Sequence, residues 1–183
     1  MTILPLPTRE TLSHLFDYDP ETGGFIWRYN PKKPAFWNGR FAGKPAFTNR
    51  NSDGYCITAF TNPENGRRAA YLAHRVAWVF ITGREPEKFI DHINGDRADN
   101  RASNLREATD QENKFNRRWK RPGSSQYRGV HRHSKNGRWI AQIRSDGRAI
   151  HLGSFTSEIE AAKARDSAAI ALRGEYASLN FPR

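Results

Sequence analysis

A basic run that ends in a Pro-Gly-Ser-Ser segment limits the size of any domain in this chain. The run "KFNRRWKRPGSSQ" spans residues 114–126, and its composition is typical of a linker. A chain of 183 residues can hold one ordinary domain or two to three small ones. The break favours small domains with thin cores. We predict four segments, which are 1–70, 71–117, a linker at 118–124, and 125–183.

The charge balance indicates a polyanionic partner. The chain has 30 Lys and Arg against 19 Asp and Glu, and its net charge is +11. Such a surface suits nucleic acid, and no long apolar run or Lys-rich amphipathic helix favours a membrane. Cys56 is the single cysteine, which excludes a disulfide framework and a cysteine-based zinc site. The N-terminus does not resemble a signal peptide, so we expect a cytosolic protein.

The residues before position 71 predict a small α+β element. Thr8 is a plausible N-cap for a helix over 8–16, and Gly23-Gly24 leads into a short aromatic strand over 25–29. A second strand is expected at "GYCITAF", residues 54–60, followed by a turn at "NPENGRR". Residues 71–83 then have the spacing of an amphipathic helix that a glycine ends.

The polar stretch "DHINGDRADNRASNLREATDQEN", residues 91–113, carries a carboxylate, an imidazole and two amides at fixed intervals. Phosphodiester hydrolysis needs a base to deprotonate water and a cation to offset charge on the leaving oxygen. The His92 imidazole can supply the base, and the Asp91 carboxylate can hold a Mg²⁺ ion as the cation. Neighbouring residues on a strand point to opposite faces, so Asp91 and His92 can serve one site only if the chain bends at that point. We expect a β-ribbon that enters this loop and a helix over 103–113 with Ser103 as its N-cap. Stretches rich in Asp, Asn and Gly are also common surface turns, so the residues alone leave both interpretations open.

A resemblance narrows this choice. Residues 73–116, "AHRVAWVFITGREPEKFIDHINGDRADNRASNLREATDQENKFN", resemble the HNH nuclease motif of phage and intron-type homing endonucleases. The resemblance implies a ββα fold around one metal ion, Mg²⁺ or Mn²⁺, and a gene carried by a phage or an intron of a bacterial host. It implies that His92 is the general base, that Asn104 braces the loop carrying His92, and that Asp91 and Asn113 are metal ligands. We interpret His74, alone on its helix, as a packing residue rather than a phosphate contact.

Beyond the linker, the pattern predicts three antiparallel strands and one helix. The strands are expected at 128–133, 139–144 and 150–155, joined by "SKNG" and "SDG" turns that favour hairpins. The following Ala-rich segment predicts a helix with a capping box from Ser157 to Glu160 and a stop at Gly174. The blocks "YRGV", "RWIAQIR", "HLGSF", "EIEAAKARDSAA" and "LNFP" resemble the plant ethylene-response-factor domain of the Apetala type. That resemblance implies a sheet that lies in the DNA major groove, backed by the helix.

Alternation along the strands assigns the two faces of this sheet. Trp139, Ala141 and Ile143 are expected to face the helix, which leaves Ile140, Gln142 and Arg144 toward DNA. Matched by position, the resemblance gives six DNA-binding residues: Arg128, His131, His133, Gln142, Arg144 and His151.

The sequence therefore predicts an α+β protein that acts as a metal-dependent endonuclease on double-stranded DNA. A rival hypothesis is a DNA-binding regulator with a degenerate nuclease motif, although the set Asp91, His92, Asn104 and Asn113 is intact. RNA binding ranks last, because the expected face carries Arg, Gln and His rather than aromatic rings for base stacking. One nuclease motif per chain predicts a nick unless two chains meet on the duplex.

Overall fold

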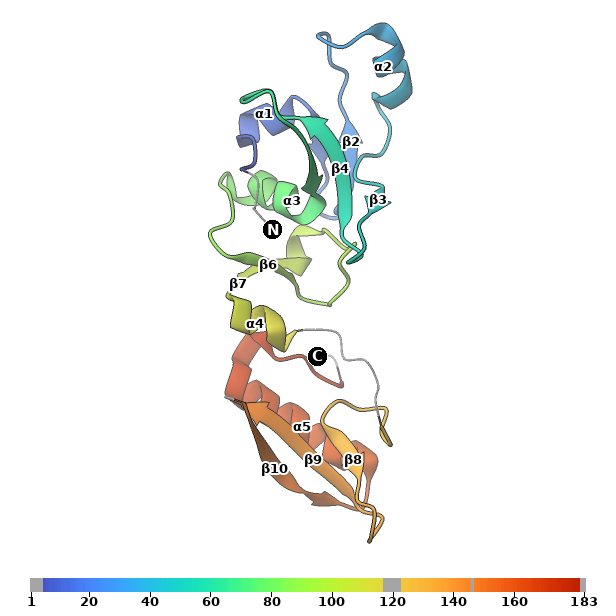
Figure 1. The fold of residues 1–183 in the computed structure, drawn as a ribbon, viewed down its shortest axis with the longest axis vertical. Coiled ribbons are helices and arrows are strands. Elements are labelled where there is room, and N and C mark those ends of the chain that lie inside the picture. The colour runs from blue at the N-terminus through green and yellow to red at the C-terminus, as the bar shows by residue number, and fades with distance from the viewer. Residues whose placement is uncertain (1–4, 117–122, 146, 182–183) are drawn as a thin grey trace. The chain divides into compact units, whose positions relative to one another are not determined.

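The computed structural model describes residues 5–116, 123–145 and 147–181. The chain divides into two compact units, Met1–Thr109 and Asp110–Arg183 (Figure 1). The linker predicted at 118–124 lies mostly outside the described residues, as does residue 146 in the predicted "SDG" turn. Each unit mixes helices and antiparallel sheet, which confirms the α+β class.

The described part of the first unit contains three small antiparallel sheets and one longer helix, α3. The sheets are β1–β2, β3–β4–β5 and β6–β7. The strands are β1 (Phe16–Tyr18), β2 (Phe25–Trp27), β3 (Asn49–Arg50), β4 (Cys56–Thr61), β5 (Arg68–Leu72), β6 (Phe89–His92) and β7 (Leu105–Ala108). The helices are α1 (Arg9–Ser13), α2 (Ala35–Phe41), α3 (Ala73–Thr82) and the 3-10 turn η1 (Ala102–Asn104).

Aromatic rings from these short strands make up much of the core of the first unit. Phe16 lies at the centre, with its ring centroid 4.6 Å from that of Trp27 and 5.3 Å from that of Phe60. Large rings bury much apolar area per residue, so a few of them can compensate for the small number of elements. The buried face of α3, including Val76 and Val79, packs onto the same cluster.

Helix ends in this unit largely follow the predicted signals. Thr8 caps α1 as expected, because its side chain accepts a hydrogen bond from the Thr11 N–H. The helix stops at Ser13 instead of residue 16, because Phe16 begins β1. Gly83 ends α3 in the left-handed conformation, at φ 78°. No helix was predicted for α2, whose N-cap position, Pro34, makes no side-chain cap hydrogen bond.

The helix predicted over 103–113 with Ser103 as N-cap is wrong. Residues Leu105–Ala108 instead form β7, which pairs antiparallel with β6 and sets His92 opposite Leu105. A helix begins only at Asp110, as α4 (Asp110–Phe115). The segment has good helix formers, but pairing with β6 buries Leu105 and Ala108. Tertiary contacts thus override local helix propensity here.

The second unit begins with α4 and continues as a three-stranded antiparallel sheet covered on one face by a helix, as predicted. The sheet has the order β8–β9–β10, and its strands are β8 (Val130–Arg132), β9 (Trp139–Ser145) and β10 (Arg148–Phe155). Helix α5 (Glu158–Arg173) ends at Gly174 and is followed by the 3-10 turn η2 (Gly174–Tyr176). Ser157 takes the N-cap position but forms no side-chain cap hydrogen bond, so the predicted capping box is wrong.

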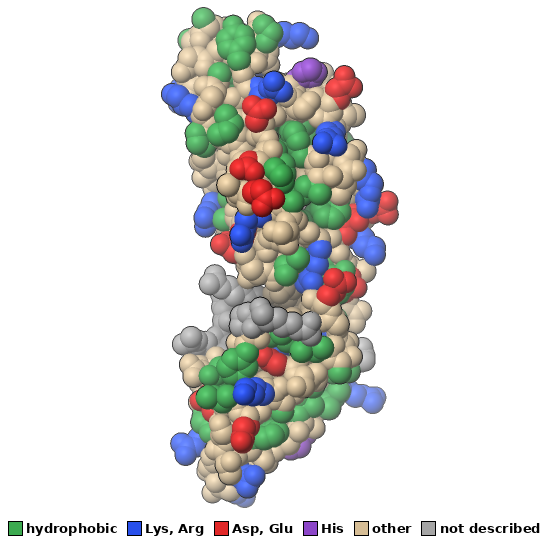
Figure 2. Space-filling view, turned by 180° about the vertical axis from the view of Figure 1, so that it is seen from behind, with side chains coloured by type: hydrophobic (Ala, Val, Ile, Leu, Met, Phe, Trp, Pro, Cys, Tyr) green, Lys and Arg blue, Asp and Glu red, His purple; other side chains and the backbone are tan. Residues whose placement is uncertain are grey.

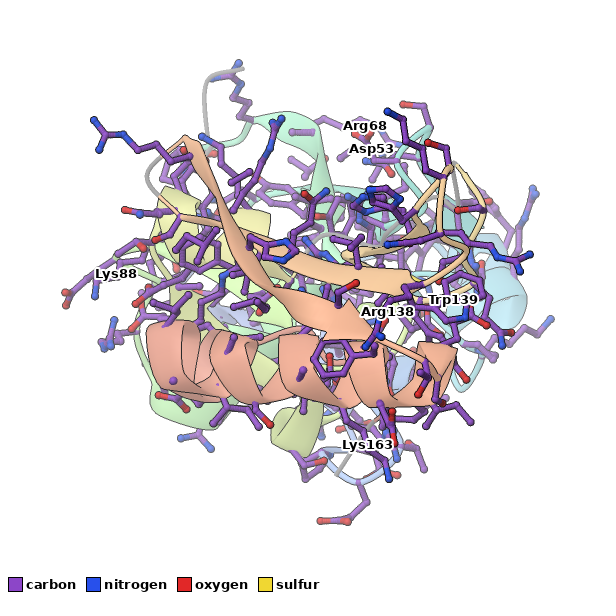
Figure 3. The ribbon with its side chains drawn as sticks, turned by 90° about the horizontal axis from the view of Figure 1, so that it is seen from below. Asp53, Arg68, Lys88, Arg138, Trp139 and Lys163 are labelled. Atoms are coloured by element: carbon purple, nitrogen blue, oxygen red, sulfur yellow. The ribbon has the colours of Figure 1, made fainter. Side chains whose placement is uncertain are left out.

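Small residues let α5 lie close to its sheet. Ala161 and Ala162 are fully buried against Val130 and Ala141, and Lys163 projects from the opposite side of the helix (Figure 3). Asp166 adds a polar clamp, since its carboxylate accepts hydrogen bonds from the backbone N–H groups of Asn180 and Phe181. The "LNFP" block therefore closes the chain onto α5.

Neither described unit contains a helix that is long and apolar enough to cross a membrane. The face drawn in Figure 2 carries basic and acidic side chains interspersed, rather than one continuous basic patch.

Candidate nuclease site and DNA-binding face

The β6–β7 ribbon carries the predicted base into a buried position. His92 ends β6 with 4% of its surface exposed, and its Nε2 lies 3.5 Å from the Asn100 Oδ1. The Asn100 amide is oriented by its Nδ2, which donates to the Ala98 carbonyl at 3.0 Å. Because a carbonyl oxygen can only accept, this contact favours a proton on Nε2 and places the imidazole lone pair on Nδ1.

The surroundings of His92 favour a neutral ring. Burial lowers the pKa of His92, while the Asn100 hydrogen bond and the charges of Asp91, Asp96 and Asp99 act in the opposite direction. A neutral imidazole is the form that can accept a proton.

Asn104 holds both ends of the loop that follows His92. Its Oδ1 accepts from the Asn94 N–H at 2.9 Å, and its Nδ2 donates to the Asp99 carbonyl at 2.8 Å. Its own carbonyl accepts from the Ile93 N–H at 2.9 Å. Three hydrogen bonds from one buried residue thus fix the turn after the base, which is the geometry that a bracing role requires.

Asp91 and His92 do point in different directions, as strand alternation predicts. The Asp91 carboxylate is buried and accepts from the Arg106 Nη2 at 2.8 Å and the Arg106 Nε at 3.0 Å. Their side chains are 5% and 13% exposed, so this is a mostly buried ion pair. Asn113 lies on α4 in the second unit, whereas Asp91, His92 and Asn104 lie in the first unit. Among the described residues, no cluster of three or more His, Cys, Asp or Glu could hold a metal ion.

Tyr55, whose ring packs beside the predicted base, was not identified from the sequence. The Tyr55 ring lies 4.9 Å from the His74 ring and 5.9 Å from the His92 ring, and the two imidazoles meet edge to face at 5.1 Å. The Arg97 guanidinium lies 4.7 Å over the Tyr55 ring. Tyr55 belongs to the predicted strand "GYCITAF", residues 54–60, to which we assigned no chemistry.

His74 packs as predicted but lacks one hydrogen bond. It is 6% exposed, and within the described residues its buried Nδ1 has no partner. Burial lowers the pKa of His74 well below its ordinary value, and the nearby charges of His92, Arg75 and Arg97 add to that effect. The residue therefore stands as a neutral imidazole against the predicted base.

The loop that contains Asn100 also packs against the turn between β1 and β2. Tyr18 donates its hydroxyl to the Asn100 carbonyl at 2.7 Å, and the Ala102 N–H donates to the Pro20 carbonyl at 2.9 Å. Gly23 passes so close that a Cβ there would lie 2.5 Å from the Arg101 nitrogen. Residues far apart in the sequence thus support the site from behind.

In the second unit, strand register places four of the six predicted DNA-binding residues on one face. His151 lies opposite Gln142 on neighbouring strands, and His131 lies opposite Ile140 in the next row. By alternation, Arg144 shares this face with Gln142. Gln142, Arg144 and His151 are exposed, but Ile140, also predicted toward DNA, is only 9% exposed.

The other two predicted residues lie beside this face. His133 follows β8, where its Nδ1 accepts from the Lys135 N–H at 3.2 Å within the turn. Arg128 precedes β8 and donates from Nη1 to the Phe115 carbonyl at 3.1 Å. Trp139 packs half-buried against the α5 side, as predicted, and lies at the start of β9 in Figure 3.

Comparison with known proteins agrees with both parts of this description. Residues 71–115 match the family model for HNH endonuclease. An AP2-like ethylene-responsive transcription factor of Arabidopsis thaliana, TOE2, is 41% identical over 80 residues, which is 44% of this chain and 16% of the relative. APETALA2-like protein 2 of Oryza sativa subsp. indica is 46% identical over 68 residues, 37% of this chain and 16% of the relative.

These plant relatives are much longer than the matched segments. A second Arabidopsis thaliana factor, PLT2, is 49% identical over 61 residues, 32% of this chain and 11% of the relative. The second unit carries the blocks from "YRGV" to "LNFP" that resemble this plant family. The chain thus combines an HNH endonuclease motif with an AP2-type DNA-binding segment.

Proposed function

We propose that the chain is a metal-dependent DNA endonuclease of the homing kind that hydrolyses phosphodiester bonds in double-stranded DNA. The observation that carries this proposal is the buried His92 at the end of β6, in a loop fixed by Asn104 and inside the HNH match. The resemblance to phage and intron nucleases supports action in the cytoplasm of a bacterial host.

His92 acts as the general base in this proposal. Its neutral imidazole takes a proton from water, which then attacks the phosphorus while the 3′ oxygen leaves. Asn104 keeps the loop in place, and Asn100 sets the tautomer through its Oδ1. A base held in one geometry loses less entropy when the water is positioned.

The metal proposal assigns Mg²⁺ or Mn²⁺ to Asp91 and Asn113. Carboxylate and amide oxygens are the donors that hard divalent cations prefer, so the donor set fits. Few protein ligands are needed, because Mg²⁺ usually keeps waters and binds substrate phosphates. A carboxylate can accept several hydrogen bonds, so the ion pair with Arg106 is compatible with a second partner. Such a cation would offset the charge on the leaving 3′ oxygen.

The test measures cleavage and DNA binding on the same proteins. His92→Ala should lower the cleavage rate by about 10²- to 10⁴-fold, as expected for loss of a general base. Binding should persist, because no phosphate-binding charge is removed. His14→Ala, at an exposed histidine of the same unit, is the control and should cut normally.

Chelation should stop cleavage and Mn²⁺ should restore it. Wild-type cleavage by His92→Ala would refute the base, and full activity in excess chelator would refute the metal.

A non-catalytic DNA-binding regulator is the alternative. The ion pair of Asp91 with Arg106 favours it, because this pair compensates the buried carboxylate without a metal. A chain that binds duplex DNA but cuts none with any divalent cation would establish the alternative.

A further inference from the structure

A pocket of about 470 Å³ opens in the second unit where β8 diverges from β9. The Gln142 N–H of β9 donates to the Gly129 carbonyl, but the Arg128 N–H donates to the Asn180 Oδ1, which lies outside β9. Four arginines line the pocket: Arg128, Arg144, Arg165 and Arg173. Two of them, Arg165 and Arg173, come from α5 and were not among the predicted DNA-binding residues.

One of the four lining arginines, Arg165, is buried. Arg165 is 2% exposed, and its Nη1 donates to the Asp166 Oδ1 at 3.1 Å. A Cβ at Gly129 would lie 2.9 Å from the Arg165 Cγ and 2.4 Å from the Gln142 carbonyl oxygen, and the φ there is +75°. Only glycine fits this position without strain, so the loop passes directly over the Arg165 side chain.

The arginines are close enough to repel one another. Burial lowers the pKa of Arg128 to about 10, and the charges of Arg165 and Arg173 add to that effect. Burial and the charge of Arg165 also lower the pKa of Arg173. Desolvated like charges are costly, and an anion among them would offset that cost.

Among the described residues, the pocket-lining Arg173 has a side-chain donor that lacks a partner. The Nη1 of Arg173 is buried and has no hydrogen-bond partner within the described part of the chain. The Nη2 of the same side chain donates to the Arg144 carbonyl at 2.7 Å, which holds the guanidinium in place. A buried and unsatisfied N–H costs free energy that a phosphate oxygen would recover.

Two of the pocket arginines also hold α4. The Arg173 guanidinium lies 4.4 Å over the Phe115 ring, and the Arg128 Nη1 donates to the Phe115 carbonyl. The HNH match ends at residue 115, so this helix belongs to the nuclease motif by sequence and to the second unit by contacts. An anion that reduces the repulsion between Arg128 and Arg173 would therefore favour the arrangement that holds α4.

We propose that this pocket binds one phosphate of the DNA backbone and that its occupation tightens α4 against the second unit. The choice of DNA as occupant rests on the proposed function, whereas the phosphate site stands on the pocket itself. The consequence would be a nuclease motif whose last helix responds to engagement of the DNA-binding unit.

The experiment measures hydrogen exchange of the α4 amides in the full chain, with inorganic phosphate or with chloride at equal ionic strength. Phosphate should slow exchange over residues 110–115 in the wild type. Arg173→Gln should bind phosphate about tenfold to a hundredfold more weakly, the loss expected for one charge-assisted hydrogen bond. Arg173→Lys keeps the charge but loses the planar fork, so its affinity should lie between the two. Arg148→Gln, at an exposed position of β10 outside the pocket, should behave as the wild type.

The outcomes separate the site from the function. Equal protection of α4 by phosphate in Arg173→Gln and the wild type, or no protection in either, would overturn the proposal. Binding of phosphate without slower α4 exchange would overturn the coupling. Protection by phosphate in a chain that binds no duplex DNA would refute DNA as the occupant and the proposed function together, while the phosphate site would stand.

Discussion

Asp91 and Arg106 show how a single substitution can test the proposed metal ligand. Arg106→Ala breaks the mostly buried ion pair with Asp91, and breaking such a pair typically costs about 3–5 kcal/mol. We expect thermal unfolding at a clearly lower temperature. If Asp91 binds Mg²⁺, the added cation should stabilise the variant more than the wild type, because ligand binding favours the folded state.

A control for this substitution comes from the same unit. Arg28 pairs with Asp17 at 3.6 Å, and both side chains are at least half exposed, so Arg28→Ala should have a much smaller effect. An Arg106→Ala protein as stable as the wild type would contradict the energetic role of the pair. Indifference of that variant to Mg²⁺ would argue against Asp91 as a ligand.

The buried His74 should make the stability of the first unit depend on pH. Burial lowers the pKa of His74 well below 6.5, so the unfolded chain takes up a proton near that pH and the folded chain does not. Stability should therefore be complete above about pH 6.5 and fall as the pH drops below it. His74→Phe removes the imidazole but keeps a ring beside Tyr55 and His92, so its unfolding temperature should fall less between pH 7 and pH 5.

Because the pKa of His92 is also lowered, the His74→Phe variant should keep part of the slope of unfolding temperature against pH. His14→Phe, at an exposed position, should keep the wild-type slope in full. Identical slopes for His74→Phe and the wild type would show that His74 does not carry the effect.

At the scale of elements, the turn before β2 supports the loop after β6. Gly23 has a φ of +72°, and a Cβ there would lie 2.5 Å from backbone atoms of Asn100 and Arg101. Gly23→Ala should therefore displace the loop whose Asn100 contacts His92, and lower both stability and cleavage. Gly66→Ala is a matched control, since Gly66 has a φ of +69° and no atom within 4 Å of the added Cβ. The two variants share the backbone strain, so a greater loss of stability and cleavage in Gly23→Ala measures the effect of the close contact with the loop. Equal losses would refute a supporting role of that contact.

Elements with strong local signals were predictable from the sequence. The three strands and α5 of the second unit follow from alternation, turn residues and the glycine at 174. Strand β7 was not, because "LREA" contains good helix formers and becomes a strand only through its pairing with β6. Local propensity cannot detect such a distant partner.

The same distinction applies to the candidate sites. His92 and Asn104 were found because the motif places them close in the sequence. Tyr55 was missed, because its position beside His92 depends on how the segment before β4 packs against the end of β6. Arg165 and Arg173 were missed for a related reason, since alternation along strands says nothing about the helix that completes a pocket.

At the scale of the whole molecule, the net charge of +11 predicts strong and salt-dependent binding to any duplex. Each phosphate contact adds to the dependence of affinity on salt, whereas contacts to base edges add discrimination between sequences. The described face of β8–β10 offers both kinds of group, because it presents the uncharged Gln142 beside the positively charged Arg144.

Gln142→Ala and Arg144→Ala should separate these two contributions. Gln142 is uncharged and exposed on the sheet face, so its loss should cost about 1–3 kcal/mol of discrimination at one base pair and leave the salt dependence unchanged. If Arg144 contacts only phosphate, its loss should weaken binding to all sequences alike and lower the salt slope by about one unit. Binding of each variant to a preferred and a scrambled duplex across a salt series measures both quantities. Arg148→Gln removes a charge from the same sheet and serves as a control for net charge. If neither variant changes affinity, discrimination or salt slope, the sheet face is not the DNA-binding face.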